Sequence, residues 1–384
     1  MSDYEKHEAK GDLAAARSSA HTVEMEPMSG VQPLSSAPST IPPPSRERRG
    51  SVTFSPDALG ALSTLPVEAA DLRGAERLLD HALAGTSKGE ILLIIENGEA
   101  KTLAAAIERA ASERGHETRA YLIDPHEPEI SAFSRRLELQ ASEACAVFLF
   151  HGEFRLSPAI LRAAQKAPRR ISFDTPTEAV ARQLLRLDLD EIERLGQKLI
   201  SKIQRMPRFE ISSGYGDQLY AEADLHAPPI HYGGRVRDEF PLYLPAGQLV
   251  FRPASLDGTL TADGGVWLED GSAIGRSLMN RVTIAGGAIS DIEGPSAQAM
   301  LEALEKSPHL RKVAGIGFGT NPGLISGVGA KVLELCLPGV HLILGDLDAP
   351  RQRVTLIPRR PELRTEREAW MVRGRYSREL LSAL

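Results

Sequence analysis

The acidic residues that follow His341 could act with it as metal ligands. His341 lies in an apolar run, residues 339–345, with the composition of a strand. Asp346 and Asp348 follow, and Arg353 and Thr355 come a few residues later. A metal site needs several converging His, Asp or Glu side chains, but the ten histidines form no HExxH motif and no HxD pair. Taken alone, a histidine on an apolar strand is more often part of the core than a ligand.

Other chemical motifs are weak. Residues 315–323 read GIGFGTNPG, a glycine-rich run whose backbone N–H groups could cradle a phosphate. The Lys-Ser/Thr of a P-loop is missing, so a tight turn with close backbone contacts is the favoured interpretation. A GxSxG pattern occurs once, as GTSKG at residues 85–89, but it stands before the first apolar strand and not between a strand and a helix, where a nucleophile elbow lies. The two cysteines, Cys145 and Cys336, lie in apolar runs, which predicts buried free thiols.

Composition limits the classes of protein. The chain has 384 residues, 42% of them hydrophobic and 25% charged, with a net charge of −6. This length predicts two globular domains, and the acidic balance gives no reason to expect nucleic acid as a partner. No run of about 18 apolar residues and no signal peptide is visible, so we expect no membrane partner and a cytoplasmic location.

The N-terminal half predicts an arm and an α/β domain. Residues 1–55 are rich in Ser, Pro and charge, and we expect a disordered arm that is either dispensable or binds a partner. Residues 56–206 alternate between buried strands and amphipathic helices, which predicts a parallel sheet with flanking helices. The expected strands are 91–95, 118–123, 144–150 and 170–173, and the expected helices are 101–114, 129–140, 157–165 and 189–204.

The C-terminal half has a different texture. Residues 207–358 hold short strands broken by Gly, Asp and Asn, which predicts an antiparallel β-rich α+β domain with helices near 296–305 and 324–334. Residues 359–384 form an arginine-rich amphipathic tail, and residues 351–378 contain nine arginines. Two interpretations of this tail stay open. One is a solvated helix face, and the other is a dock for an acidic peptide, since guanidinium groups bind carboxylates bidentately.

Four short motifs resemble the aminopeptidase T (M29) family of metallopeptidases and its dihydroxypyridine dioxygenase relatives. In chain order they read PLYLPAGQLVFRPASLDGTL, GGAISDIEG, GIGFGTNPG and GVHLILG. The match covers residues 207–358 well, and the preceding domain fits by layout. The resemblance implies an α/β domain followed by a β-rich, metal-binding domain of aminopeptidase T type, and a homodimer.

The family's metal ligands are largely missing at the positions that the resemblance implies. Its first glutamate falls on Gln248, a poor cation ligand, and its second falls on Gly315. His341 is retained. The terminal His-x-Asp pair falls on Arg353 and Thr355, and an arginine cannot lose its proton to become a ligand. We therefore expect no metal cofactor, unless shifted ligands such as Asp346 or Asp348 hold a zinc or cobalt ion.

These expectations lead to a hypothesis of a pseudoenzyme. We expect a non-catalytic, peptide-binding protein that guides a precursor peptide in peptide natural-product (RiPP) biosynthesis. The side chains expected to line its cleft are Tyr243, Gln248, Arg252, Asn321, His341 and Arg353. Gln248 and Asn321 would bond a peptide backbone, and Arg353 would pair with an acid. The alternatives are an active metalloaminopeptidase with atypical ligands, a ring-cleaving oxygenase, and a structural subunit of an active paralogue.

Overall fold

The computed structural model describes eleven stretches of the chain. They are residues 58–96, 98–123, 130–152, 158–174, 177–185, 187–235, 242–268, 273–274, 278–324, 331–348 and 353–381. The N-terminal arm expected at residues 1–55 lies outside them.

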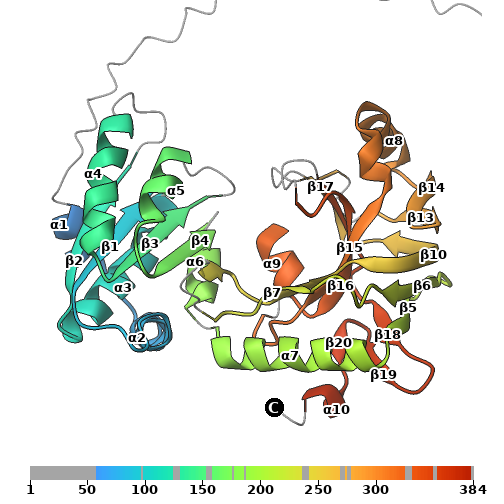
Figure 1. Ribbon diagram of the computed structural model, residues 1–384, viewed down its shortest axis with the longest axis horizontal. Helices are drawn as coiled ribbons and strands as arrows, with labels where there is room; N and C mark the ends of the chain where they lie inside the picture. Colours follow the sequence, from blue (N-terminus) through green and yellow to red (C-terminus); the bar gives the residue numbers. More distant parts are fainter. Residues whose placement is uncertain are drawn as a thin grey trace, which may run out of the picture. The chain divides into compact units, whose positions relative to one another are not determined.

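The first half of the described chain forms a five-stranded parallel sheet with helices on both faces, as the sequence predicts (Figure 1). The strand order is β2-β1-β3-β4-β8, and every pairing is parallel. Its strands are β1 (Glu90–Ile95), β2 (Glu117–Leu122), β3 (Ala146–His151), β4 (Arg170–Asp174) and β8 (Leu242–Leu244). Its helices are α1 (Ala58–Ser63), α2 (Ala69–Ala82), α3 (Lys101–Glu113), α4 (Ile130–Glu143), α5 (Pro158–Ala164) and α6 (Glu178–Leu184).

Strands that are apolar at every position require helices on both faces of the sheet. In β1, Ile91, Leu93 and Ile95 pack with α2, α3 and α6, whereas Leu92 and Ile94 pack with α4 and α5 on the opposite face. A strand that is apolar at every position cannot leave either face in water, so it needs a helical layer on each side.

The α/β core also recruits residues from much later in the chain. Strand β8 pairs with β4, and Leu333 and Cys336 on helix α9 (Lys331–Cys336) join the same apolar cluster as β1. Both cysteines are free, with Cys336 buried and Cys145 half-buried. The fold therefore brings segments around residues 242 and 333 onto a sheet built mainly from residues 90–174.

The second half forms two mostly antiparallel sheets. The eight-stranded sheet has the order β14-β13-β10-β6-β5-β18-β19-β20, and the seven-stranded sheet has the order β12-β11-β17-β16-β15-β9-β7. Helices α7 (Leu189–Arg205) and α8 (Ala297–Lys306) pack on their shared core. None of the described helices, in either half of the chain, is long and apolar enough to cross a membrane.

The strands of the two sheets are β5 (Arg208–Ser212), β6 (Leu219–Ala223), β7 (Ile230–Tyr232), β9 (Gln248–Phe251), β10 (Pro253–Ala262), β11 (Gly265–Leu268), β12 (Ala273–Ile274), β13 (Asn280–Ala285), β14 (Ala288–Glu293), β15 (Val313–Gly319), β16 (Gly339–Gly345), β17 (Arg353–Ile357), β18 (Glu362–Arg364), β19 (Ala369–Val372) and β20 (Arg375–Tyr376).

The interpretation of the C-terminal tail as a helix face is wrong. Residues 362–376 form β18, β19 and β20, which extend the eight-stranded sheet, and within the described tail only the four residues of α10 (Arg378–Leu381) are α-helical (Figure 1). Leu363, Trp370, Met371 and Tyr376 are buried in the core shared by both sheets. In these short strands and turns, exposed arginines and buried apolar residues follow one another at irregular intervals. In the sequence alone, that mixture resembles the pattern of an amphipathic helix.

Two glycines open a slot for a buried histidine beneath α7. The side chain of His231 is 5% exposed, and its Nδ1 lies 3.6 Å from Oε2 of Glu193. A Cβ atom at Gly196 would lie 1.9 Å from Nε2 of His231, and one at Gly233 would lie 2.2 Å from Cε1. Helix α7 therefore needs glycine at a position where alanine would otherwise be the better helix former.

Replacing Gly196 with Ala should destabilise the protein by about 1–3 kcal/mol, because the new methyl group overpacks against a buried ring. The control is Gly60→Ala in α1, where nothing lies within 4 Å of the new Cβ. That change should stabilise by about 0.5–1 kcal/mol. Urea unfolding measures both free energies. If both variants changed the free energy of unfolding in the same direction, the close packing of His231 against Gly196 would be contradicted.

Candidate functional site

The period-two alternation of β16 determines where the candidate residues lie. Val340, Leu342 and Leu344 point into the core between the two sheets, so His341 and Ile343 must point to the opposite face. Directly paired residues of neighbouring strands share a face. The register therefore places on one face of the seven-stranded sheet the residues Tyr232, Gln248, Gly317, Gly319, His341, Ile343 and Thr355. We call this surface the His341 face.

The glycine-rich run is a strand and not a turn over its first five residues. Gly315 to Gly319 lie in β15, and the turn residues are Pro322 and Gly323. The alternate glycines make room for neighbours on the His341 face. A Cβ at Gly317 would lie 1.9 Å from Nε2 of His341, and one at Gly319 would lie 1.6 Å from the carbonyl oxygen of Leu337. The close backbone contact expected from the sequence is thus present at Gly319.

Gln248 and His341 are in direct contact. The amide nitrogen Nε2 of Gln248 lies 2.9 Å from Nε2 of His341. An amide nitrogen only donates, so the imidazole accepts this hydrogen bond with the lone pair that a metal ion would use. Burial, and secondarily the charge of Lys331, lower the pKa of His341 from 6.5 to about 3. The histidine is therefore neutral at physiological pH.

A buried lysine lies close to this pair. Lys331, at the start of α9, is 3% exposed, and its ammonium donates a hydrogen bond to the carbonyl oxygen of Leu268 at 2.6 Å. Its charge lowers the pKa of His341. A divalent cation bound at His341 would be repelled by the same positive charge.

The residues of the His341 face do not fit a two-metal centre. Where the resemblance implies a glutamate, a Cβ at Gly315 would lie 2.7 Å from Cγ1 of Val250 and 3.2 Å from Cδ2 of Leu347. These two side chains belong to a buried apolar cluster with Ala314 and Ile343. Among the described residues, no group of three or more His, Cys, Asp or Glu side chains is placed to hold a metal ion.

Arg252 and Arg353 lie together at the turn after β16. Arg252 forms an ion pair with Asp348 at 3.1 Å. Arg353 donates to the carbonyl oxygen of Asp346 at 2.8 Å, and also to that of Leu347. Asp346 accepts a hydrogen bond from the backbone N–H of Asp348 at 2.8 Å. The two carboxylates considered as shifted metal ligands thus have partners in this turn.

Asn321 is buried in the segment that follows β15. Its amide nitrogen donates to the carbonyl oxygen of Ala246 at 3.1 Å, and its amide oxygen accepts from the N–H of Gly323 at 3.2 Å. The backbone N–H of Thr320 donates to the carbonyl oxygen of Gly247 at 2.6 Å. These bonds join the two turn motifs that carry the family resemblance.

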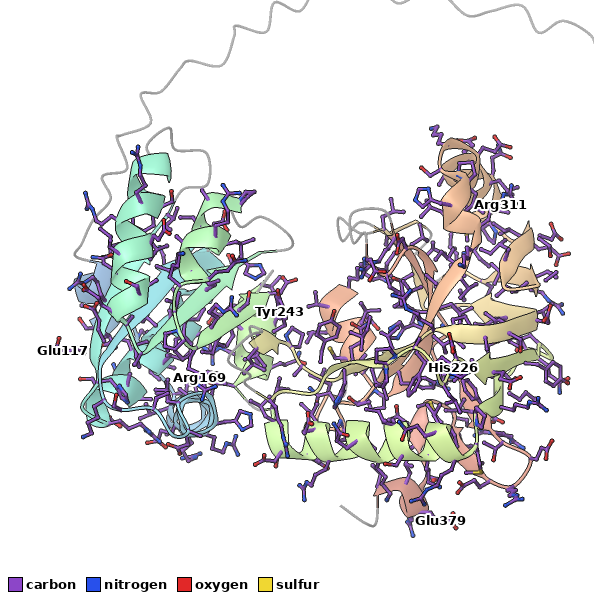
Figure 2. The ribbon with its side chains drawn as sticks, viewed as in Figure 1. Glu117, Arg169, His226, Tyr243, Arg311 and Glu379 are labelled. Carbon is purple, nitrogen blue, oxygen red and sulfur yellow. The ribbon has the colours of Figure 1, made fainter. Side chains whose placement is uncertain are left out.

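Tyr243 belongs to an exposed aromatic pair. It lies on the short strand β8, with half of its surface exposed, and Figure 2 labels its side chain. Its ring centroid lies 6.2 Å from that of Tyr232 in an edge-to-face arrangement. Tyr232 is paired with Gln248 across β7 and β9. The pair therefore adds aromatic surface beside the Gln248–His341 hydrogen bond.

The fold thus brings Tyr243, Gln248 and His341 to one region and places Arg252 and Arg353 at a turn. Sequence reasoning missed Tyr232 and Lys331. The alternation of β7 against β9 could have indicated Tyr232 once their register was known. Nothing in the sequence around Lys331 indicates that its ammonium is buried or that its charge acts on His341, because the two residues are brought together only by the packing of a helix and a strand.

Two solved structures share this fold. One is 2,5-dihydroxypyridine dioxygenase from Pseudomonas putida KT2440, with a TM-score of 0.57 and 17% identity over 81% of this chain and 98% of that chain. The other is AmpT from Thermus thermophilus, with a TM-score of 0.54 and 14% identity over 80% of this chain and 98% of that chain. No family model and no curated protein matches the sequence. The expected aminopeptidase T-like fold is confirmed, and at this identity the likeness concerns the fold alone.

The buried, neutral His341 should make stability sensitive to acid. Its folded pKa of about 3 lies below the unfolded value of 6.5, so the unfolded state binds the proton first and stability falls as pH drops below 6.5. Between pH 7 and pH 5, this one group should lower the free energy of unfolding by about 2 kcal/mol. Urea unfolding of His341→Asn should show a smaller loss than wild type over that range.

The matched control for this measurement is His309→Asn, which removes an exposed imidazole. Its unfolding free energy should follow the wild-type pH dependence. If His341→Asn did the same, the neutral buried state of His341 would be refuted.

Proposed function

We propose that this chain is a metal-free, non-catalytic peptide-binding protein on an aminopeptidase T-like scaffold. The observation that carries the proposal is the hydrogen bond between Gln248 and His341, at 2.9 Å. The one histidine that the family resemblance retains is engaged by an uncharged amide. A side-chain amide supplies neither the negative charge that stabilises a divalent cation nor the basicity of a catalytic carboxylate.

The surroundings of this bond support the same conclusion. Structural metal sites gain on the order of 10 kcal/mol from several deprotonated ligands, and the residues at the other implied ligand positions are Gly315, Arg353 and Thr355. Apolar side chains fill the space beside Gly315, and the charge of Lys331 opposes a cation near His341. A donor set reduced to one neutral imidazole cannot offset the cost of dehydrating the ion.

Peptide binding is supported by what the region offers instead. Tyr232 and Tyr243 present exposed, amphipathic rings, which bind at a low cost in side-chain entropy. Gln248 is half-buried next to them and can exchange its bond with His341 for bonds to a peptide backbone. We propose a precursor peptide of a natural-product pathway as the ligand and a homodimer as the assembly. Arg252, Asn321 and Arg353 are part of this proposal as further peptide contacts.

Purified protein should contain far less than one equivalent of zinc, cobalt or iron, as measured by elemental mass spectrometry after incubation with each ion and desalting. Gln248→Glu, which restores one carboxylate, should not restore binding, because Gly315 and Lys331 still oppose it. Stoichiometric metal, with aminopeptidase activity that a chelator abolishes, would instead establish the metalloaminopeptidase.

Tyr243→Ala should weaken peptide affinity by about tenfold, because an exposed aromatic anchor at an interface contributes about 1–2 kcal/mol. The probe is a synthetic peptide made from any short open reading frame that lies beside the gene, and it is titrated by calorimetry. The matched control is Tyr220→Ala. Tyr220 is another half-exposed tyrosine and lies on β6 of the eight-stranded sheet. The peptide affinity of this variant should equal that of wild type. Absence of heat at about 100 μM peptide would reject the proposed ligand.

A further inference from the structure

We propose that four arginines at the end of the eight-stranded sheet form a docking surface for an acidic peptide segment. Arg359, Arg360, Arg373 and Arg375 are all exposed, and we call them the arginine surface. The site is independent of the peptide contacts proposed on the His341 face. It uses the C-terminal strands β18 to β20, drawn in red in Figure 1.

The backbone brings two pairs of arginines together. The N–H of Gly374 donates to the carbonyl oxygen of Pro361 at 2.7 Å. A Cβ at Gly374 would lie 3.2 Å from the carbonyl oxygen of Arg359 and 3.5 Å from Cα of Arg360. The turn between β19 and β20 is thus folded against the segment before β18, and the two arginines that flank Gly374 lie next to the pair at 359 and 360.

Within the described chain, the nearby glutamates pair with other cations and leave Arg360, Arg373 and Arg375 without an ion pair. Glu362 pairs with Arg364, and Glu368 pairs with Lys202. The carboxylate of Asp263 accepts hydrogen bonds from the N–H of Arg359 and from the hydroxyl of Tyr215, so one negative charge lies beside Arg359. Residues 353–381 carry eight arginines and four glutamates, although the whole chain is negative.

The turn keeps an arginine where the backbone disfavours it. Arg373 has φ 51° and Gly374 has φ 73°, which matches a two-residue hairpin turn of type I′. Asn-Gly is the preferred sequence for that turn, and a non-glycine residue with positive φ is uncommon. An arginine in this place costs stability, and such strain recurs at functional surfaces.

Charge complementarity selects the occupant. Guanidinium groups bind carboxylates bidentately, and four of them on two adjacent segments match two or more acidic side chains of a short peptide. A nucleic acid would also meet the rest of a chain whose net charge is −6, since its phosphates extend well beyond one Debye length of about 10 Å. A short acidic peptide contacts the arginine surface alone.

The experiment titrates a fluorescein-labelled peptide of alternating Glu and Gly into the full chain and follows its anisotropy. A peptide with Gln in place of Glu is the charge control. The double variant Arg360→Gln/Arg373→Asn should weaken binding of the acidic peptide by about tenfold, which corresponds to about 0.7 kcal/mol for each contact. Arg373→Asn alone should be at least as stable as wild type in urea, because Asn suits the turn, so lost binding cannot be attributed to misfolding.

Arg281→Gln removes an exposed arginine from β13 at the other end of the same sheet and should leave affinity unchanged. Equal affinity of the double variant and wild type would overturn the proposal. So would equal losses in the double variant and Arg281→Gln, or equal binding of the Gln peptide. Tighter binding of a single-stranded oligonucleotide than of the acidic peptide at the same ionic strength would assign the surface to nucleic acid and also overturn it.

Discussion

Strand β16 has to bury both of its faces, and the β-rich half of the protein is arranged around that constraint. Val340, Leu342 and Leu344 are fully buried in the core between the two sheets. Because side chains alternate along a strand, His341 must then lie on the other face. A buried imidazole needs a hydrogen-bond partner, and Gln248 supplies it from a strand two positions away in the sheet.

The glycines of β15 make room for the hydrogen bond between Gln248 and His341. Strand β15 lies between β9 and β16, so any side chain on its outer face would stand between Gln248 and His341. Gly317 leaves the space that the imidazole fills, and Gly315 leaves space that Val250 and Leu347 fill. The same absence of side chains that permits the hydrogen bond removes the carboxylate position that the family resemblance implies. The packing of this face and the lack of a side chain at that position therefore have the same cause.

The turns that carry the resemblance have a structural role that is separate from metal chemistry. Asn321 holds the carbonyl of Ala246, and the N–H of Thr320 holds the carbonyl of Gly247. Gly247 has φ 112°, a conformation that favours glycine, and Asn321 packs within 2.7 Å of where its Cβ would lie. These contacts fix the start of β9, and with it the position of Gln248. A fold of this type can thus retain its turn motifs while the side chains between them change.

The sequence by itself determined the layered α/β sheet, the strand assignment of His341, and the aminopeptidase T-like order of motifs. It could do so because solid apolar runs and period-two alternation are local signals. Only the tertiary structure decided that β15 is a strand, that the arginine-rich tail adds three strands to a sheet, and that Lys331 lies near His341. Those outcomes depend on register and on which layers meet, and pairing between distant segments leaves no local pattern to read.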